Sequence, residues 1–411
     1  MIPKAARGRI SETRLHASVN DLCDLGVKYA GTPGEIKARD YLLSKLIDFG
    51  LEDVHLEKFK YLNFMPSEGE LEIISPMRRM MNCEPLQHSA NEEVEGELVY
   101  TGTSKEEFEK FVARGVSFKD KIVLTKTPFP FYVYPLAEKY GAAGIVVITD
   151  PPDNLIRAAT GVGDRREGTI PGVTTSAAEG KYLLHLLKRG KVKVRVKSQG
   201  EYSKKESWNI IGNIHGNEWS EEKVIVCSHY DSQIKGQHAW DNVSGDAGLL
   251  EIARSMVGFN LKRTVEIIFF GVEEQGPFWG STSYVAEHEK ELKDNRAVLI
   301  NLDGFSSSLC PKNFLETTPE ARNYALGIAR ELDWPVHHVG NPMPLSDHVS
   351  FMQVGVPTIW IHEGLIDPYY HTEGDIKDHI DPKKLAKITH VAESCAFKLA
   401  SSEKLPFEVS K

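Results

Sequence analysis

The sequence predicts an α/β protein with a central, mostly parallel (mixed) sheet, together with a smaller β-rich domain inserted into it. Near-continuous apolar runs alternate with helical stretches in the C-terminal half, as in strands that are covered on both faces. The middle of the chain instead contains several short strands. The chain has 411 residues, more than a single hydrophobic core usually organises, so two domains are expected.

The N-terminal segment predicts a helix followed by a strand. Apolar residues in 34–50 recur at helical intervals, and Gly50 is a fitting helix end. Residues 54–64 alternate in polarity, which is typical of a strand. We assign this segment to the larger domain, which is then discontinuous and consists of residues 1–66 and 205–411.

Residues 67–204 are predicted to form the inserted domain. Short strands are expected within 95–102, 119–127, 141–150 and 191–198, and helices within 134–144 and 177–190. The polar stretch 198–207 is predicted to be the linker that leads back to the larger domain. Insertion of a domain at a surface loop is well tolerated in folded proteins.

The C-terminal half supplies the strands of the central sheet. Apolar runs predict strands within 209–216, 223–231, 264–274, 297–304 and 357–364, and helices are expected over 242–257 and 319–332. Because strands and helices alternate here, most neighbouring strands are expected to be parallel.

Composition excludes several classes of protein. A net charge of −9 argues against nucleic acid and anionic membrane as partners, since both bind basic surfaces. No apolar run is long enough for a membrane helix, and the N-terminus lacks the apolar core of a secretory signal. Five widely spaced cysteines suggest free thiols in a reducing compartment. We therefore predict a cytoplasmic protein, or a secreted one if a signal has been removed. The oligomeric state is unreadable from the sequence.

Polar residues follow the predicted strands at their carboxyl ends. They are two histidines, a tyrosine and several carboxylates, namely His229, Asp231, Asp241, Glu273, Glu274, Asp303, Tyr370 and His371. In an open α/β sheet the loops after the strands converge on one crevice, so these side chains are expected at one rim. Imidazoles and carboxylates without a thiolate suit Zn²⁺, with Mn²⁺ or Co²⁺ as possible substitutes.

Each of these residues also has an ordinary structural explanation. Glu273 and Glu274 could lie on an exposed bend, Asp241 could cap a helix, and Asp303 could belong to a turn. Histidine at a strand end is more often structural than a metal ligand. Their joint occurrence at the ends of successive strands is what favours a metal site.

The order of the motifs resembles the M28 family of metallopeptidases, which are dizinc aminopeptidases and their relatives. The resemblance rests on "SHYDS", "DNVSG", "GVEEQG", "NLDG" and "YYHTEGD", and it covers residues 205–411. The inserted segment resembles a protease-associated (PA) domain. The resemblance implies a zinc-exopeptidase-type three-layer fold and two Zn²⁺ ions. It also implies hydrolysis of peptide bonds by a metal-bound hydroxide, with short peptides as substrates that lose their N-terminal residues.

The resemblance also implies a role for each site residue. His229 and Asp303 would bind one zinc, Glu274 and His371 the other, Asp241 would bridge the two, and Glu273 would be the general base. One departure is Trp240, which stands where relatives often have a smaller or acidic residue, so the neighbouring pocket is expected to differ in shape.

Three further expectations concern how the side chains point. Neighbouring residues of an extended segment point in opposite directions, so Glu274 can face the metal while Glu273 faces the water. Asp231, two residues after His229, is expected to accept a hydrogen bond from its second ring nitrogen. Tyr370 is expected to donate to the oxyanion, with a packing role as the alternative.

Other functions remain open at this stage. A carboxypeptidase or another amidohydrolase could use the same metal core. A receptor-like scaffold could keep the fold without catalysis, although the full set of ligands and base disfavours it. A serine hydrolase lacks support because the sequence contains no G-x-S-x-G motif.

Overall fold

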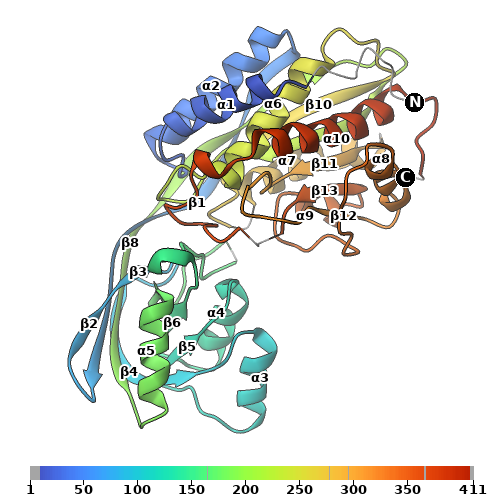
Figure 1. The fold of residues 1–411 in the computed structure, drawn as a ribbon. Helices are drawn as coiled ribbons and strands as arrows, with labels where there is room; N and C mark the ends of the chain where they lie inside the picture. The colour runs from blue at the N-terminus through green and yellow to red at the C-terminus, as the bar shows by residue number, and fades with distance from the viewer. Residues whose placement is uncertain (1–9, 164, 277, 295, 365–366, 408–411) are drawn as a thin grey trace.

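The computed structural model describes residues 10–163, 165–276, 278–294, 296–364 and 367–407. The chain forms a larger and a smaller lobe, which are joined by the long strands β1 (Glu52–Ser75) and β8 (Lys193–Ile214) (Figure 1). β1 and β8 pair antiparallel along most of their length. Within the described ranges, no helix combines the length and the apolar character that crossing a membrane requires.

The larger lobe is built on a mixed, mostly parallel sheet in the order β12-β13-β11-β9-β10-β8. Its strands are β9 (Trp219–His229), β10 (Arg263–Phe270), β11 (Val298–Leu302), β12 (Phe314–Thr317) and β13 (Thr358–His362). β9 is parallel to β10 and β11, and β11 is parallel to β13, whereas β12 and β8 are antiparallel to their neighbours. The predicted α/β class with a mostly parallel central sheet is therefore confirmed.

Helices cover both faces of this sheet and make the lobe three layers deep. One face carries α1 (Glu12–Asp24), α2 (Pro33–Phe49), α6 (Ser244–Met256) and α10 (Pro382–Ser401), with α8 (Arg322–Glu331) in the same core. The other face carries α7 (Trp279–Asp294) and α9 (His348–Gln353). Burial on both faces explains why the central strands read as continuous apolar runs: every residue of β10 and β11 is buried.

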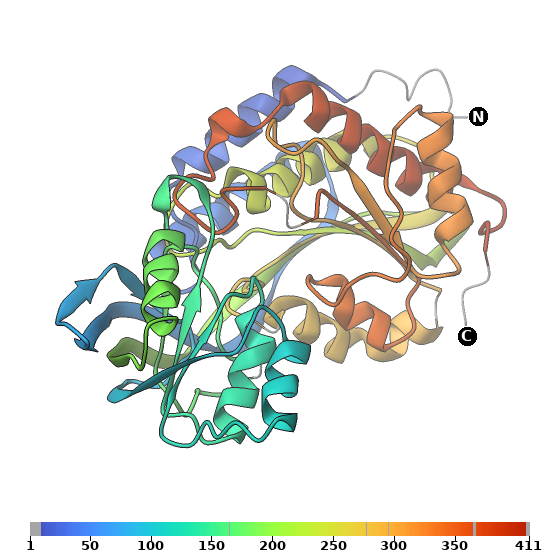
Figure 2. The same cartoon turned by 60° about the horizontal axis from the view of Figure 1, so that its bottom comes forward.

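The smaller lobe has its own sheet and two cores. β4 (Glu92–Tyr100), β5 (Ile122–Thr125), β6 (Gly144–Ile148) and β7 (Gly172–Thr175) are parallel to one another, while β3 (Cys83–Pro85) is antiparallel to β7. α3 (Lys105–Ala113), α4 (Pro130–Lys139) and α5 (Ala177–Leu187) pack on it, and the short β2 (Arg79–Met81) pairs with β1. Figure 2 shows this lobe, coloured cyan and green, beside the larger one.

The linker prediction for residues 198–207 was wrong. These residues are the middle of β8 and pair with β1. Their polar character suits a two-stranded ribbon, in which cross-strand charges pair: Lys58 Nζ lies 3.1 Å from Glu206, and Lys197 Nζ lies 2.8 Å from Glu70. The predicted domain boundaries, 66/67 and 204/205, both fall within this ribbon, and that division of the chain stays a prediction.

The strand register brings the polar loops of the larger lobe to one edge. His229, the last residue of β9, lies opposite Phe270, the last residue of β10. On the other side of β9, Asn301 of β11 lies opposite Cys227, which places Asp303 level with His229. The residues that follow these three strands therefore emerge together at the carboxyl edge of the sheet.

Candidate active site

Six predicted side chains meet at this edge as two adjacent groups. His229, Glu273 and Asp303 form the first group, and Asp241, Glu274 and His371 form the second. Within each group, one ligand atom from every residue lies within 4.8 Å of the others. The residues come from the end of β9, from the loops after β10 and β11, from the turn that leads into α6, and from the loop before α10.

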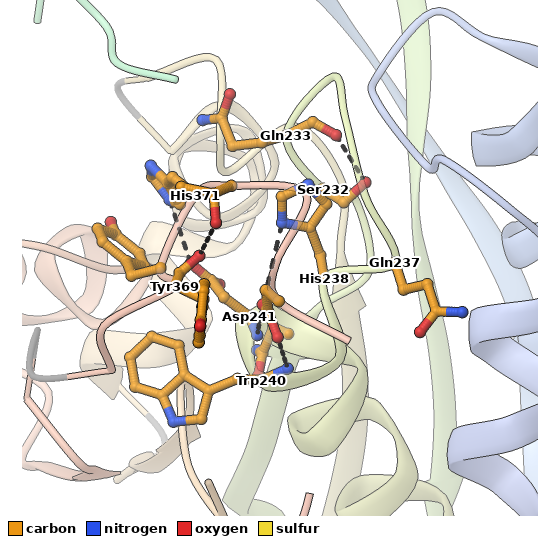
Figure 3. A network of polar contacts seen from close by, with 12 residues as sticks. Ser232, Gln233, Gln237, His238, Trp240, Asp241, Tyr369 and His371 are labelled. Atoms are coloured by element: carbon orange, nitrogen blue, oxygen red, sulfur yellow. Dashed lines mark hydrogen bonds and ion pairs between the residues drawn. The ribbon is translucent and has the colours of Figure 1, made fainter. Parts of the chain in front are cut away.

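Asp241, a member of the second group, also reaches the first group. Its Oδ2 is 3.1 Å from His371 Nε2 (Figure 3). Its Oδ1 is 3.1 Å from His229 Nε2. The backbone N–H groups of Trp240 and Asp241 donate to the carboxylate of Asp375, at 2.8 and 3.1 Å. This anchor fixes the backbone of Asp241 so that each of its oxygens faces a different group, as a bridging ligand requires.

The histidine of the first group is oriented by the backbone. His229 Nδ1 lies 3.2 Å from the carbonyl oxygen of Asp231. Because a carbonyl oxygen only accepts, Nδ1 carries the proton, and Nε2 is left free to bind a cation. His229 Nε2 points at Asp303 Oδ1, 3.3 Å away.

The second group is oriented in the same way by contacts from both lobes. His371 Nε2 lies 3.0 Å from Glu274 Oε2, while its Nδ1 donates to the carbonyl oxygen of Ala158, at 3.3 Å. Glu274 Oε2 also accepts a hydrogen bond from Gln233 Nε2, at 2.9 Å. The other carboxylate oxygen of Glu274 is buried and has no hydrogen-bond partner among the described residues, so it is free for a cation.

The carboxylate of Asp231 makes its shortest contacts to a neighbouring strand end. Its two oxygens accept from the backbone N–H groups of Glu273 and Glu274, at 2.9 and 3.2 Å. The distance from Asp231 Oδ1 to His229 Nδ1 is longer, at 3.7 Å. The expected hydrogen bond from His229 to this carboxylate is therefore not made, because the ring nitrogen donates to the carbonyl oxygen of Asp231 instead. The carboxylate fixes the turn that sends Glu273 to one group and Glu274 to the other.

Buried negative charge dominates the electrostatics of the site. Burial raises the pKa of Glu273 well above its usual range, although His229 partly opposes the shift. Burial likewise raises the pKa of Glu274. Burial alone would lower the pKa of His371, but Glu274 and Asp241 outweigh it and raise that pKa to about 9. Without cations, the site therefore holds protons to offset its carboxylates.

The residues fit two zinc ions. The two groups contain four carboxylates and two imidazoles, so two divalent ions would balance the four negative charges without any extra proton. Oxygen and imidazole nitrogen without thiolate is a donor set that suits Zn²⁺. His229, Asp303 and Asp241 would hold one ion, and Glu274, His371 and Asp241 the other.

Two hollows flank the groups. A small pocket of about 410 Å³ lies on one side, and its walls include Trp240, Met343, Leu345, Trp360, His362 and Tyr370. A large cleft of about 1030 Å³ lies on the other side, and it is bordered by Phe129, Phe131 and Tyr132 of the smaller lobe and by Phe278, Glu274 and His371 of the larger lobe. Glu273, Leu345 and Tyr370 border both hollows. The two ligand groups thus lie between the two hollows.

Trp240 shapes the small pocket. Its indole N–H donates to Glu363 Oε2 at 2.9 Å, and its ring lies edge-on to Tyr370, with 5.7 Å between the ring centres. The ring packs on Gly304, where a Cβ atom would come within 2.8 Å of it. The expectation that this tryptophan affects the neighbouring pocket thus agrees with its position in the wall.

Several residues of the site were missed in the sequence. Asp375 lies within the "YYHTEGD" motif, but an acidic residue after glycine resembles an ordinary turn. Gln233 and Ala158 carry no chemical signature that could mark them. Asp347, in the loop before α9, is fully buried close to the first group, and burial raises its pKa to about 7.

The three-layer lobe and its paired ligand groups define a class of protein, the metal-dependent hydrolases with a two-metal site. Residues 209–396 match the family model of peptidase family M28, and residues 94–183 match that of the PA domain. The larger lobe is thus similar to peptidase family M28 over residues 209–396, and the smaller lobe contains a PA domain. The chain is accordingly a metallo-exopeptidase.

Known relatives cover most of the chain. Aminopeptidase YwaD of Bacillus subtilis (strain 168) is 27% identical over 96% of this chain and 86% of its own length. Carboxypeptidase Q of Bos taurus is 24% identical over 88% of this chain and 79% of its own length. Among solved structures, an aminopeptidase from Aneurinibacillus sp. strain AM-1 is 26% identical, covers 97% of this chain and 96% of its own, and has a TM-score of 0.77.

Proposed function

We propose that the protein is a dizinc aminopeptidase that releases N-terminal residues from short peptides. The observation that carries this proposal is that the small pocket offers no cation to a peptide C-terminus. None of its described lining residues is lysine or arginine. A C-terminal carboxylate would need such a cation from the protein, whereas the amine of a peptide N-terminus does not.

The residues of the two groups have distinct parts in this proposal. His229, Asp303, Glu274 and His371 would hold the zinc ions, together with Asp241, whose two oxygens face the two groups. When bound, the two ions supply Lewis acidity that activates water and polarises the scissile carbonyl.

Glu273 serves as the proton carrier. It lies at the border between the small pocket and the large cleft, where the scissile bond of a bound peptide would lie. Its carboxylate accepts a proton from the attacking water and donates it to the leaving amine. The hydrogen bond from its backbone N–H to Asp231 keeps it in this place.

Tyr370 serves as a donor to the oxyanion. It also borders both hollows, and its ring lies against His371, with 3.6 Å between the ring centres. Burial, together with the nearby Asp241 and Glu274, raises the pKa of its hydroxyl well above the usual range. The hydroxyl therefore stays protonated and can donate a hydrogen bond throughout the neutral and mildly alkaline range.

A carboxypeptidase is the second candidate, because carboxypeptidase Q is among the relatives. A panel of substrates separates the two functions. The zinc-loaded protein should hydrolyse aminoacyl substrates and short peptides with a free N-terminus, and it should spare the same peptides once they are N-acetylated. Release of C-terminal residues from N-acetylated peptides would overturn the aminopeptidase assignment.

We also infer a cytoplasmic location and a function without nucleic acid or membrane partners. All five cysteines are free, which agrees with a reducing compartment. The net charge of −9 does not favour binding to polyanions. Fractionation of the native cells would test the location, and recovery of the protein outside the cytoplasm would contradict it.

A further inference from the structure

The smaller lobe reaches into the metal site through residues 153–160. The backbone N–H of Ala158 donates to the carbonyl oxygen of His371 at 3.0 Å. In return, His371 Nδ1 donates to the carbonyl oxygen of Ala158 at 3.3 Å. The smaller lobe thus sets both the backbone position and the ring tautomer of a residue that would bind zinc.

The residues before His371 are held by the same segment. Arg157 Nε donates to the carbonyl oxygen of Tyr370 at 3.0 Å, and its guanidinium lies 5.2 Å from the centre of the Tyr370 ring. Tyr369 donates through its hydroxyl to Asp153 Oδ2 at 2.8 Å. Three consecutive residues, 369–371, are therefore each hydrogen-bonded to the smaller lobe.

Glu274 is held by a second route. Gln87 of the smaller lobe donates through Nε2 to Gln233 Oε1 at 2.5 Å, and Gln233 Nε2 donates to Glu274 Oε2 at 2.9 Å. Thr160 Oγ1 lies 3.4 Å from Gln87 Oε1 and 3.5 Å from the carbonyl oxygen of Glu274. Both glutamines are 1% exposed, so water does not compete for these bonds.

The first group is held by contacts within the larger lobe. Among the described residues, His229 is hydrogen-bonded to Asp231 and Asp303, and the backbone N–H of Asp303 donates to Ile361. All of these partners belong to the larger lobe. The two groups therefore differ in how they are supported.

The backbone of His371 shows why the support is needed. Its φ of +58° lies in the left-handed region, which residues other than glycine rarely adopt. Such a conformation persists only where the surroundings hold it. The paired hydrogen bonds with Ala158 and the contacts of Arg157 provide that restraint.

We propose that Gln87, Arg157 and the backbone of Ala158 are positioning parts of the Asp241–Glu274–His371 group, so that zinc affinity there depends on the smaller lobe. The affinity of the His229–Asp303 side does not depend on it. This inference rests on the proposed zinc site. It assigns the smaller lobe a part in building the centre, whether or not the lobe also contacts substrate.

Two substitutions test the proposal, each in two backgrounds. Arg157→Met removes the hydrogen bond to Tyr370, and Gln87→Met removes the hydrogen bond to Gln233. In both cases methionine fills the space with an unbranched side chain that cannot donate. Asp303→Asn removes a ligand from the first group, so zinc binding in this background measures the second group. Glu274→Gln removes a ligand from the second group, so zinc binding in that background measures the first group. Zinc affinity is measured by competition with a chromophoric chelator.

In the Asp303→Asn background, each substitution should weaken zinc binding by about 10- to 100-fold, the usual effect of losing a residue that orients a ligand. In the Glu274→Gln background, neither substitution should change the zinc affinity by more than about twofold, because effects at independent sites add. Arg195→Met is the matched control, because Arg195 of β8 pairs with Glu72 of β1 and Glu95 of β4. It should leave both affinities unchanged.

Circular dichroism and urea unfolding check that each variant is folded. Unchanged zinc affinity in the Asp303→Asn background, in both folded variants, would overturn the proposal. Equal weakening in the two backgrounds would also overturn it, because the lobe would then act on the whole site. If the wild-type protein bound no zinc, the proposed function itself would fail, so the two failures are distinguishable.

Discussion

Replacing Glu273 with glutamine removes the proposed base while keeping the shape of its side chain. Glu273 is 8% exposed, and the hydrogen bond from its backbone to Asp231 does not depend on its side chain. The amide can neither accept a proton from water nor pass one to the leaving amine. We therefore expect Glu273→Gln to fold and to bind peptide as the wild type does, but to turn it over very slowly.

The size of the loss follows from the role of the residue. A positioned general base contributes roughly 10²- to 10⁴-fold to a rate. At about 1.36 kcal/mol for each factor of ten, its removal adds about 2.7–5.4 kcal/mol to the barrier.

The assay measures kcat and KM on an aminoacyl substrate, with bound zinc determined by elemental analysis. Glu273→Gln should keep two zinc ions per chain and a KM within a few-fold of the wild type. Glu251→Gln is the control, because Glu251 is also buried but pairs with Arg14 and Arg254 away from the site. A kcat within tenfold of the wild type would refute the role of base, and loss of one zinc would show that Glu273 is a ligand instead.

Three further predictions follow from the site and the core. Tyr370→Phe should lower kcat by about 10²- to 10³-fold, the usual effect of losing an oxyanion donor, while KM and zinc content stay unchanged. A kcat equal to that of the wild type would mean that Tyr370 only packs against its neighbours. Dialysis against a chelator should abolish hydrolysis, and two equivalents of zinc should restore it; full recovery with one equivalent would contradict a two-metal site. Burial raises the pKa of Asp246 to about 8. Between about pH 4 and pH 8 the folded protein therefore keeps a proton on this group that the unfolded chain has lost. The free energy of unfolding consequently falls as the pH rises through this range. Asp246→Asn can still accept the hydrogen bond from Ser228. In urea unfolding of the zinc-free protein, this variant should be more stable than the wild type at pH 8.5, and its advantage should be smaller at pH 5. An equal advantage at both pH values would contradict the raised pKa.

Much of the fold could be predicted because it depends on local pattern. Strands buried on both faces, such as β10 and β11, leave a continuous apolar run in the sequence. The rule that parallel strands end at one edge then brings Glu273 and Asp303 toward His229, as the structure shows. The linker prediction failed because the polar residues of 198–207 also suit an exposed two-stranded ribbon, and sequence polarity alone does not distinguish the two.

The supports of the site could not be predicted, because they depend on contacts between distant segments. Asp375 holds the backbone of Asp241 from 134 positions away, and Arg157 reaches the carbonyl oxygen of Tyr370 from 213 positions away. Neither residue type indicates its partner. Gln87 contributes through an ordinary amide, which is found throughout any protein surface. The fold of the larger lobe brings Asp375 to Asp241, and the packing of the two lobes brings Arg157 and Gln87 to the metal ligands.

Anomalous diffraction at the zinc edge, from crystals of the zinc-loaded protein, tests the central claim most directly. We expect two peaks, one against His229 and Asp303 and one against Glu274 and His371, with Asp241 between them. A single peak, or peaks away from these five side chains, would contradict the two-metal centre on which the proposed function depends.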